Sequence, residues 1–125
     1  MRPQTLSEVA ALTQAGEPFD FALRGFLDEF QMQPDPSRLH AEPARLVSVV
    51  RDGETCDAFL AATAETLAAT HGFEAPVWVW QETRKLHRPW FALPWQGLRA
   101  ILLLESPAAF RSRNLFVSAN ALSRV

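Results

Sequence analysis

The feature that most constrains the fold is an apolar stripe in the first third of the chain. Five large apolar side chains recur at the three- and four-residue steps of an α-helix: Phe19, Leu23, Phe26, Leu27 and Phe30. Pro18 suits the first turn of that helix, and prolines at positions 34 and 36 end it. The stripe therefore predicts an amphipathic helix whose apolar face packs on the rest of the protein. Gly25 inside the stripe predicts a close contact with a neighbouring helix.

Two further helices have recognisable ends. Thr5 and Glu8 form a capping box, which predicts a helix over residues 6–15. The longest helix is expected over residues 54–71, with acidic residues at its start and Gly72 at its end. Its inner face is expected to hold Cys56, Phe59, Leu60, Thr63 and Leu67.

Three segments in the middle of the chain carry mixed signals. Residues 44–50 are rich in β-branched side chains, but Pro43 at a plausible helix start and the helical neighbours favour a helix. Residues 75–80 fit either a helical turn or an extended piece. Residues 86–95 are expected to be irregular and to wrap over the helices, because prolines at positions 89 and 94 interrupt regular hydrogen bonding.

The last quarter of the chain is expected to dock on the core. Residues 98–104 predict a buried helix, and Ser106 and Pro107 predict the cap and first position of another over residues 108–114. Residues 116–125 are ambiguous. Large apolar side chains continue to the end of this stretch, unlike in a disordered tail: Phe110, Leu115, Phe116, Val117 and Leu122.

Together these patterns predict an all-α fold. Residues 1–125 are expected to form one domain, an orthogonal bundle of about five to seven helices with an irregular Trp/Pro-rich crossover and a docked C-terminus.

Composition agrees with an ordinary globular domain. Of the 125 residues, 48% are hydrophobic and 21% are charged, which is enough for one core without disulfides or metal. Cys56 is the single cysteine, which excludes an intrachain disulfide and a cysteine-based zinc cluster. The first residues lack a secretory apolar region, and the longest wholly apolar run, residues 100–104, is far shorter than a membrane span. We expect a cytoplasmic protein without a membrane-spanning segment.

Charge is unevenly distributed although the net charge is only −2. Residues 1–80 hold five basic and twelve acidic residues, whereas residues 81–125 hold seven basic and two acidic residues. Either the two parts pack together through surface ion pairs worth about 0–1 kcal/mol each, or the basic part faces an acidic partner or nucleic acid. Composition does not choose between these readings.

Motifs for cofactor and metal chemistry are missing from the sequence. The chain lacks the HExxH, CxxC, EF-hand, Walker and GxGxxG patterns, and no serine sits in a Gly-x-Ser-x-Gly elbow. His40, His71 and His87 are far apart and have no ligand spacing. Cys56 lies on a predicted apolar face, as is typical of a buried structural thiol. We therefore expect no cofactor and no metal ion.

Paired carboxylates lie inside the amphipathic helix. Asp28 and Glu29 are flanked by apolar residues, so at least one of them is expected near the boundary of the core with a partner. Arg111 and Arg113 are the predicted partners, because guanidinium groups bind carboxylates in a bidentate fork and tolerate partial burial. A structural ion-pair network is favoured over an acid/base site.

Tryptophan and basic residues alternate in one segment. The set consists of Trp78, Trp80, Arg84, Lys85, Arg88, Trp90 and Trp95. Core packing is the first interpretation of the tryptophans. The same set is also a candidate partner surface, because tryptophan and arginine anchor protein interfaces. Single-stranded nucleic acids are bound by a similar interleaving of basic and aromatic side chains.

Four blocks of the sequence occur together: Leu27-Asp-Glu-Phe30, Trp90-Phe91, the run from Leu98 to Asn114, and the ending from Phe116 to Arg124. They include the motif FRxRNxFVSxNALSR. With these blocks the chain resembles a family of small uncharacterised bacterial helical proteins. The family has no established activity. The resemblance implies an association with nucleotidyltransferase-like or toxin–antitoxin genes, and it carries over no catalytic residue.

Three functional hypotheses follow. The first is a non-enzymatic protein-interaction module, such as an antitoxin-like accessory protein, that binds a protein partner or a second copy through the Trp/Arg surface. The second is nucleic-acid binding by the basic C-terminal third, against which the overall acidity counts. The third is an enzyme using Asp28 or Glu29, which needs a pocket beside those carboxylates.

Overall fold

The computed structural model describes residues 2–92, 106–119 and 121–122, and it is mostly helical. Its α-helices are α1 (Leu6–Gln14), α2 (Phe19–Met32), α3 (Ser37–His40), α4 (Gly53–His71) and α6 (Ala108–Arg111). Two 3₁₀ turns, η1 (Val77–Trp80) and η2 (Glu82–Arg84), and two short strands, β1 (Trp90–Phe91) and β2 (Leu115–Phe116), complete the described elements. Among the described residues, no helix is long and apolar enough to cross a membrane.

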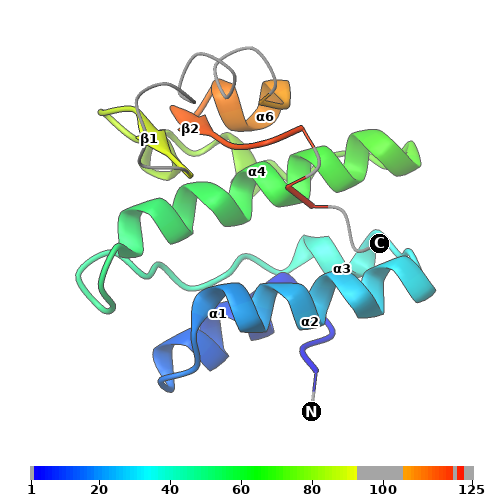
Figure 1. The fold of residues 1–125 in the computed structure, drawn as a ribbon. Helices are drawn as coiled ribbons and strands as arrows, with labels where there is room; N and C mark the ends of the chain where they lie inside the picture. The colour runs from blue at the N-terminus through cyan, green and yellow to red at the C-terminus, as the bar shows by residue number, and fades with distance from the viewer. Residues whose placement is uncertain (1, 93–105, 120, 123–125) are drawn as a thin grey trace.

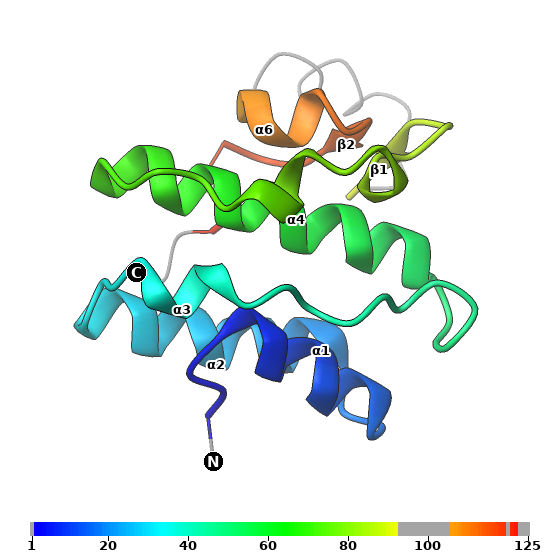
Figure 2. The same ribbon diagram turned by 180° about the vertical axis from the view of Figure 1, so that it is seen from behind.

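Helix α4 runs through the middle of the molecule with a layer on each side. Figure 1 shows α1, α2 and α3 on one side, the N-terminal layer, and β1, β2 and α6 on the other, the C-terminal layer; Figure 2 shows the same order from behind. Both faces of α4 are apolar. Leu60, Ala61 and Leu67 belong to the cluster shared with α1 and α2, while Ala58 and Ala62 pack with the C-terminal layer. Small alanine side chains allow neighbours on both sides to approach closely.

The predicted ends of α1, α2 and α4 are confirmed within a residue or two. The Thr5 hydroxyl accepts a hydrogen bond from the Glu8 amide at 3.1 Å, and the Glu8 carboxylate accepts one from the Gln4 amide at 2.9 Å. The first bond satisfies an amide that a helix start leaves without a partner, whereas the second goes to the residue before Thr5 and not to the Thr5 amide of a strict capping box. At the far end of α4, Gly72 adopts a φ of 71°, the left-handed conformation that glycine tolerates best.

The close contact predicted at Gly25 exists, but its partner is not a helix. A Cβ atom at this position would lie 3.3 Å from Pro3 Cδ and 3.6 Å from Arg2 Cγ. The segment before α1 therefore crosses α2 at Gly25. The absence of a side chain allows this extended segment to lie against the helix.

The helix predicted over residues 44–50 is wrong. Residues 42–46 have no regular secondary structure, and turns follow up to Asp52. The cause lies in α4: the buried Asp57 carboxylate accepts hydrogen bonds from the backbone amides of Leu46 at 2.7 Å and Val47 at 3.1 Å. A Cβ at Gly53 would lie 1.9 Å from the Leu46 carbonyl oxygen, so the chain packs on α4 at a distance that only glycine permits.

The all-α prediction is wrong in one respect, because β1 and β2 form a small parallel sheet. Trp90 pairs with Leu115, and Phe91 pairs with Phe116. The Trp90 amide donates to the Asn114 carbonyl at 2.8 Å, and the Ala92 amide donates to the Phe116 carbonyl at 3.0 Å. A two-residue pairing carries too little periodicity to be recognised from sequence.

The described part of the C-terminal block is docked, as expected. Phe110, Leu115 and Val117 are buried. Helix α6 is shorter than the predicted 108–114, and Ser106 does not cap it: its hydroxyl donates to the Val117 carbonyl at 2.9 Å and accepts from the Val117 amide at 2.8 Å. Ser106 thus fixes the residue that follows β2. The predicted helix over 98–104 lies outside the described residues.

Candidate functional site

The two tryptophans of η1 have opposite environments. Trp78 is 5% exposed, and its indole Nε1 donates to the Leu39 carbonyl at 3.0 Å. Trp80 is 55% exposed and Val77 is 86% exposed. A 3₁₀ helix has three residues per turn, so residues 77 and 80 lie on one side. The short turn buries Trp78 and Val79 while it displays Val77 and Trp80 together.

Arg84, with Arg113, is the largest kind of side chain that is fully buried among the described residues. Its guanidinium donates to the Pro43 carbonyl at 2.7 Å and lies 3.7 Å from the Glu42 carboxylate and 3.9 Å from that of Asp57. It also lies 4.9 Å from the Trp78 ring centroid. Burial lowers the pKa of Arg84, while the negative charges of Asp57 and Glu42 act in the opposite direction. Arg84 therefore joins three segments of the core.

The predicted partner surface is accordingly divided. Trp78 and Arg84 belong to the interior, so the Arg84 guanidinium is not available to a phosphate or a partner. Lys85 pairs with Glu82 at 3.2 Å, and Arg88 is exposed. Trp90 lies elsewhere, in the cavity described below, and Trp95 lies outside the described residues. Of the predicted tryptophans, Trp80 is the one whose described side chain is mainly exposed.

The predicted pairing of Asp28 and Glu29 with Arg111 and Arg113 is wrong. Asp28 and Glu29 lie 4.0 Å and 3.6 Å from the guanidinium of Arg2. Helix α4 stands between α2 and the C-terminal layer, so an arginine of that layer meets α4 first (Figure 1).

Arg113 is buried, as an inward-directed arginine must be, but its carboxylate partner is on α4. It binds Glu65 at 2.6 Å and donates to the carbonyls of Ala109 and Val79, each at 2.8 Å. Arg111 is exposed. Glu65 and Asp57 are the carboxylates that the sequence interpretation missed. Each is a charged residue next to the apolar positions of a long helix, which is the feature that made Asp28 a candidate for a buried ion pair.

Asp28 lines a surface hollow of about 460 Å³ beside Arg2, Phe21 and Gly25. Its carboxylate faces the Arg2 guanidinium there, which favours an ion pair that holds the N-terminal segment on α2. Glu29 is not part of this hollow. The pocket that an acid/base role requires is therefore present beside one of the two carboxylates.

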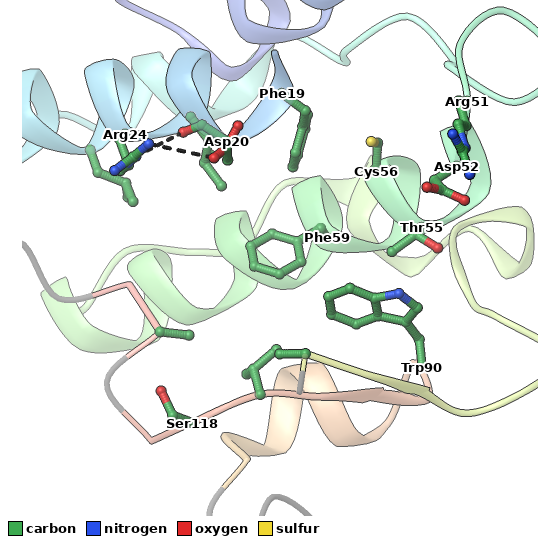
Figure 3. A pocket seen from close by; sticks show the side chains of 15 residues that line it. Phe19, Asp20, Arg24, Arg51, Asp52, Thr55, Cys56, Phe59, Trp90 and Ser118 are labelled. Carbon is green, nitrogen blue, oxygen red and sulfur yellow. Dashed lines mark hydrogen bonds and ion pairs between the residues drawn. The ribbon is translucent and has the colours of Figure 1, made fainter. Parts of the chain in front are cut away.

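A larger cavity, of about 610 Å³, lies where α2, α4 and the C-terminal layer meet (Figure 3). Its wall is mainly apolar and comes from segments far apart in sequence: Phe19, Leu23, Leu27, Phe59, Trp90 and Val117. The rings of Phe19 and Phe59 meet edge to face with centroids 6.0 Å apart. Aromatic and aliphatic walls of this size are typical of ligand sites.

Polar groups lie at two ends of this cavity. Asp20 and Arg24 form an ion pair at 3.4 Å on α2. Arg51, Asp52 and Thr55 lie at the opposite end, where α4 begins (Figure 3).

Cys56 lines the same cavity, and its pKa is raised to about 11, first by burial and then by the negative charges of Asp57 and Asp52. The thiol is therefore protonated at neutral pH, which does not suit a nucleophile.

The histidines occupy structural or exposed positions. His71 packs between Phe30, at a centroid distance of 5.2 Å, and Phe73, at 5.8 Å. His40, His71 and His87 are all exposed. Within residues 2–92, 106–119 and 121–122, no three His, Cys, Asp or Glu side chains gather as a metal site would require.

No protein-family model, curated protein sequence or solved structure matches this chain. The family resemblance therefore remains a prediction.

Proposed function

We propose that this protein is a non-enzymatic protein-interaction module whose partner contacts Val77 and Trp80. The observation that carries the proposal is the joint exposure of these two large apolar side chains, 86% and 55%, on one side of η1. Tryptophan is one of the residue types enriched among the side chains that dominate binding energy at protein interfaces.

The surface formed by Val77 and Trp80 is anchored to the core by the two residues between them. Trp78 and Val79, the residues between them, are buried. The Trp78 indole donates a hydrogen bond to the Leu39 carbonyl, and the Val79 carbonyl accepts one from Arg113. A preorganised surface loses little side-chain and backbone freedom on binding, which favours affinity. The buried arginines therefore support the proposed surface without belonging to it.

The charges around this surface favour a basic partner. The Glu42 carboxylate accepts a hydrogen bond from the Gln81 side-chain amide at 3.2 Å, next to Trp80. Glu65 binds Arg113, and the guanidinium carbon of Arg113 lies 5.9 Å from the centroid of the Trp80 ring. Each of these carboxylates is paired with a buried arginine, Glu42 with Arg84 and Glu65 with Arg113. In both pairs the carboxylate is the more exposed partner: the side chains of Glu42 and Arg84 are 47% and 0% exposed. We therefore propose a partner segment with Lys or Arg beside an apolar side chain.

A site-specific photo-crosslinking experiment tests this function. A photoreactive residue replaces Val77 in the full-length protein, expressed in its native host, and the same residue replaces Val49 in a control. Val49 is matched because it is also a large apolar side chain, 55% exposed. We expect a discrete protein adduct at position 77 that is absent at position 49 and is lost with Trp80→Ala.

The crosslinked partner peptide, sequenced by mass spectrometry, should contain Lys or Arg next to an apolar residue. Equal adducts at both positions, or none at position 77, contradict the proposal. An adduct to nucleic acid instead of protein favours the nucleic-acid hypothesis.

An antitoxin-like or accessory role is the form of this function that the family resemblance implies. A cytoplasmic location is part of the same proposal, because the single cysteine is a buried free thiol and a reducing compartment suits it.

A further inference from the structure

The polar groups at the α4 end of the large cavity differ from the other charged groups that line it. Asp20 and Arg24 are paired with each other. The side chains of Arg51, Asp52 and Thr55 make no hydrogen bond or ion pair with any residue in the described part of the chain. Arg51 and Asp52 are adjacent and exposed, yet they do not pair with each other. The cavity thus has one guanidinium and one carboxylate available side by side.

We propose that this cavity binds a free α-amino acid with a large apolar side chain. The ligand carboxylate accepts hydrogen bonds from Arg51, its ammonium group donates to Asp52, and its side chain lies among Phe19, Phe59 and Trp90. The proposal goes beyond the interaction function, because none of these residues belongs to the Val77 and Trp80 surface.

The ligand chemistry follows from the groups present. Guanidinium binds a carboxylate through two parallel hydrogen bonds, and a carboxylate accepts strongly from an ammonium group. One carbon atom separates the two charges of an α-amino acid, so a matching site needs opposite charges close together, as on two consecutive residues. A simple carboxylic acid or amine leaves one of the two protein charges without a partner.

The backbone at Asp52 helps to place its carboxylate. Asp52 has φ 57° and ψ 30°, the left-handed region, which an aspartate adopts at a small energetic penalty. Figure 3 shows the Asp52 side chain beside Arg51, at the same end of the cavity as Cys56 and Thr55. The contribution of Asp52 to the raised pKa of Cys56 agrees with a negative charge close to the cavity wall.

The apolar part of the cavity selects the side chain of the ligand. A volume of about 610 Å³ falls in the ordinary range for small-molecule sites, roughly 300–1,000 Å³. The partly buried rings of Phe19, Phe59 and Trp90 provide edges and faces that an aromatic or branched aliphatic side chain covers. Glycine has the same charges and lacks this contact, so it should bind far more weakly.

Titration calorimetry of the full-length protein tests the inference with L-phenylalanine, L-tryptophan and L-leucine as probes. At least one should bind with a dissociation constant in the millimolar range or tighter. N-acetyl-phenylalanine, which lacks the ammonium group, phenethylamine, which lacks the carboxylate, and glycine, which lacks the side chain, should each bind at least tenfold more weakly. These comparisons use the unmodified protein and do not depend on the folding of a variant.

Two variants assign the charges, and a third is the control. Arg51→Gln and Asp52→Asn should each weaken the best probe at least tenfold, and asparagine keeps the left-handed backbone accessible. Glu54→Gln removes a neighbouring exposed carboxylate that lines a different hollow, so it should leave the affinity unchanged.

The proposal is overturned if no probe binds at millimolar concentration, if glycine or N-acetyl-phenylalanine binds as tightly as the best probe, or if Arg51→Gln and Asp52→Asn bind like the unmodified protein. None of these outcomes bears on the Val77 and Trp80 surface, whose crosslinking test is separate.

Discussion

Two regions of this molecule are stabilised in contrasting ways. Helices α1 and α2 associate through apolar side chains, among them Leu6, Val9 and Phe26, which are fully buried. Around the first turns of α4, the segment at residues 42–47 and the turn η2 are joined to that helix by charged groups: Glu42, Arg45, Asp57 and Arg84.

The contrast shows how a small protein can fix the conformation of a segment that has no regular secondary structure. A regular helix satisfies its own backbone and needs only an apolar face to be placed. An irregular segment must find hydrogen-bond partners elsewhere, because a buried amide without a partner is destabilising. Asp57 supplies two such acceptors for residues 46 and 47, and Arg84 supplies a donor for the Pro43 carbonyl.

The largest expected effect is at Asp57. Asp57→Ala leaves the Arg84 and Arg45 guanidinium groups without a buried counterion and the amides of Leu46 and Val47 without an acceptor. We expect a loss of about 3–5 kcal/mol in the free energy of unfolding, measured with urea. In hydrogen exchange, amides 46 and 47 should lose protection while α1 and α2 keep theirs. Uniform loss over the whole molecule would contradict the separation of the two regions.

The apolar region should respond next. Leu6 is fully buried against α2, and Leu6→Ala removes its side chain and leaves a cavity. We expect a loss of about 2–5 kcal/mol in the same urea experiment. Phe21→Ala is the control, because Phe21 is on α2 but 62% exposed, and its effect should lie within about 0.5 kcal/mol. If both variants lose equal stability, the apolar face of α2 has been assigned wrongly.

A smaller effect is expected at the start of α1. Thr5→Ala removes the hydroxyl that caps the Glu8 amide, and it should destabilise the protein by about 1 kcal/mol in thermal or urea unfolding. Ser7→Ala, inside the first turn and not at the cap position, is the control and should change stability by less. An equal effect at both positions would exclude a specific capping contribution.

The smallest expected effect concerns the reactivity of Cys56, which lies in the apolar cluster shared with α1 and α2 and directly precedes Asp57. With the pKa of the thiol raised to about 11, only about one thiol in a thousand is ionised at pH 8. Iodoacetamide should therefore modify the folded protein about 100-fold more slowly than the protein in denaturant. Cys56 is the single cysteine, so the modified mass reports on it alone. Rapid modification of the folded protein would contradict its burial.

Helices α1, α2 and α4 were predictable because their signals are local. The Phe19 to Phe30 stripe, the capping box at Thr5 and the terminating Gly72 each depend on residues within one or two helical turns of one another. Those elements are where the pattern placed them. The helix expected over residues 44–50 failed because its conformation depends on Asp57, ten residues away on another element.

The candidate sites were predictable only in part. The tryptophans predicted a partner surface in the segment around Trp80. The spacing of the residues did not predict that Trp80 is exposed while Trp78, two residues earlier, is buried. The start of α4 was predicted within one residue. The unpaired state of Arg51 and Asp52 was not predictable, because it depends on what surrounds them in space. Arg113 was rightly expected to point inward and was paired with the wrong helix.

The sequence by itself determined the positions and ends of α1, α2 and α4, the apolar character of their inner faces and the docking of the residues around Phe110. Each depends on the spacing of side chains along one segment. Only the tertiary structure decided that Arg84 is a core residue, that Arg113 binds Glu65, and that Phe19, Phe59 and Trp90 share one cavity. The physical reason is that charged and aromatic side chains find partners by proximity in space, which depends on how α4 separates the two layers.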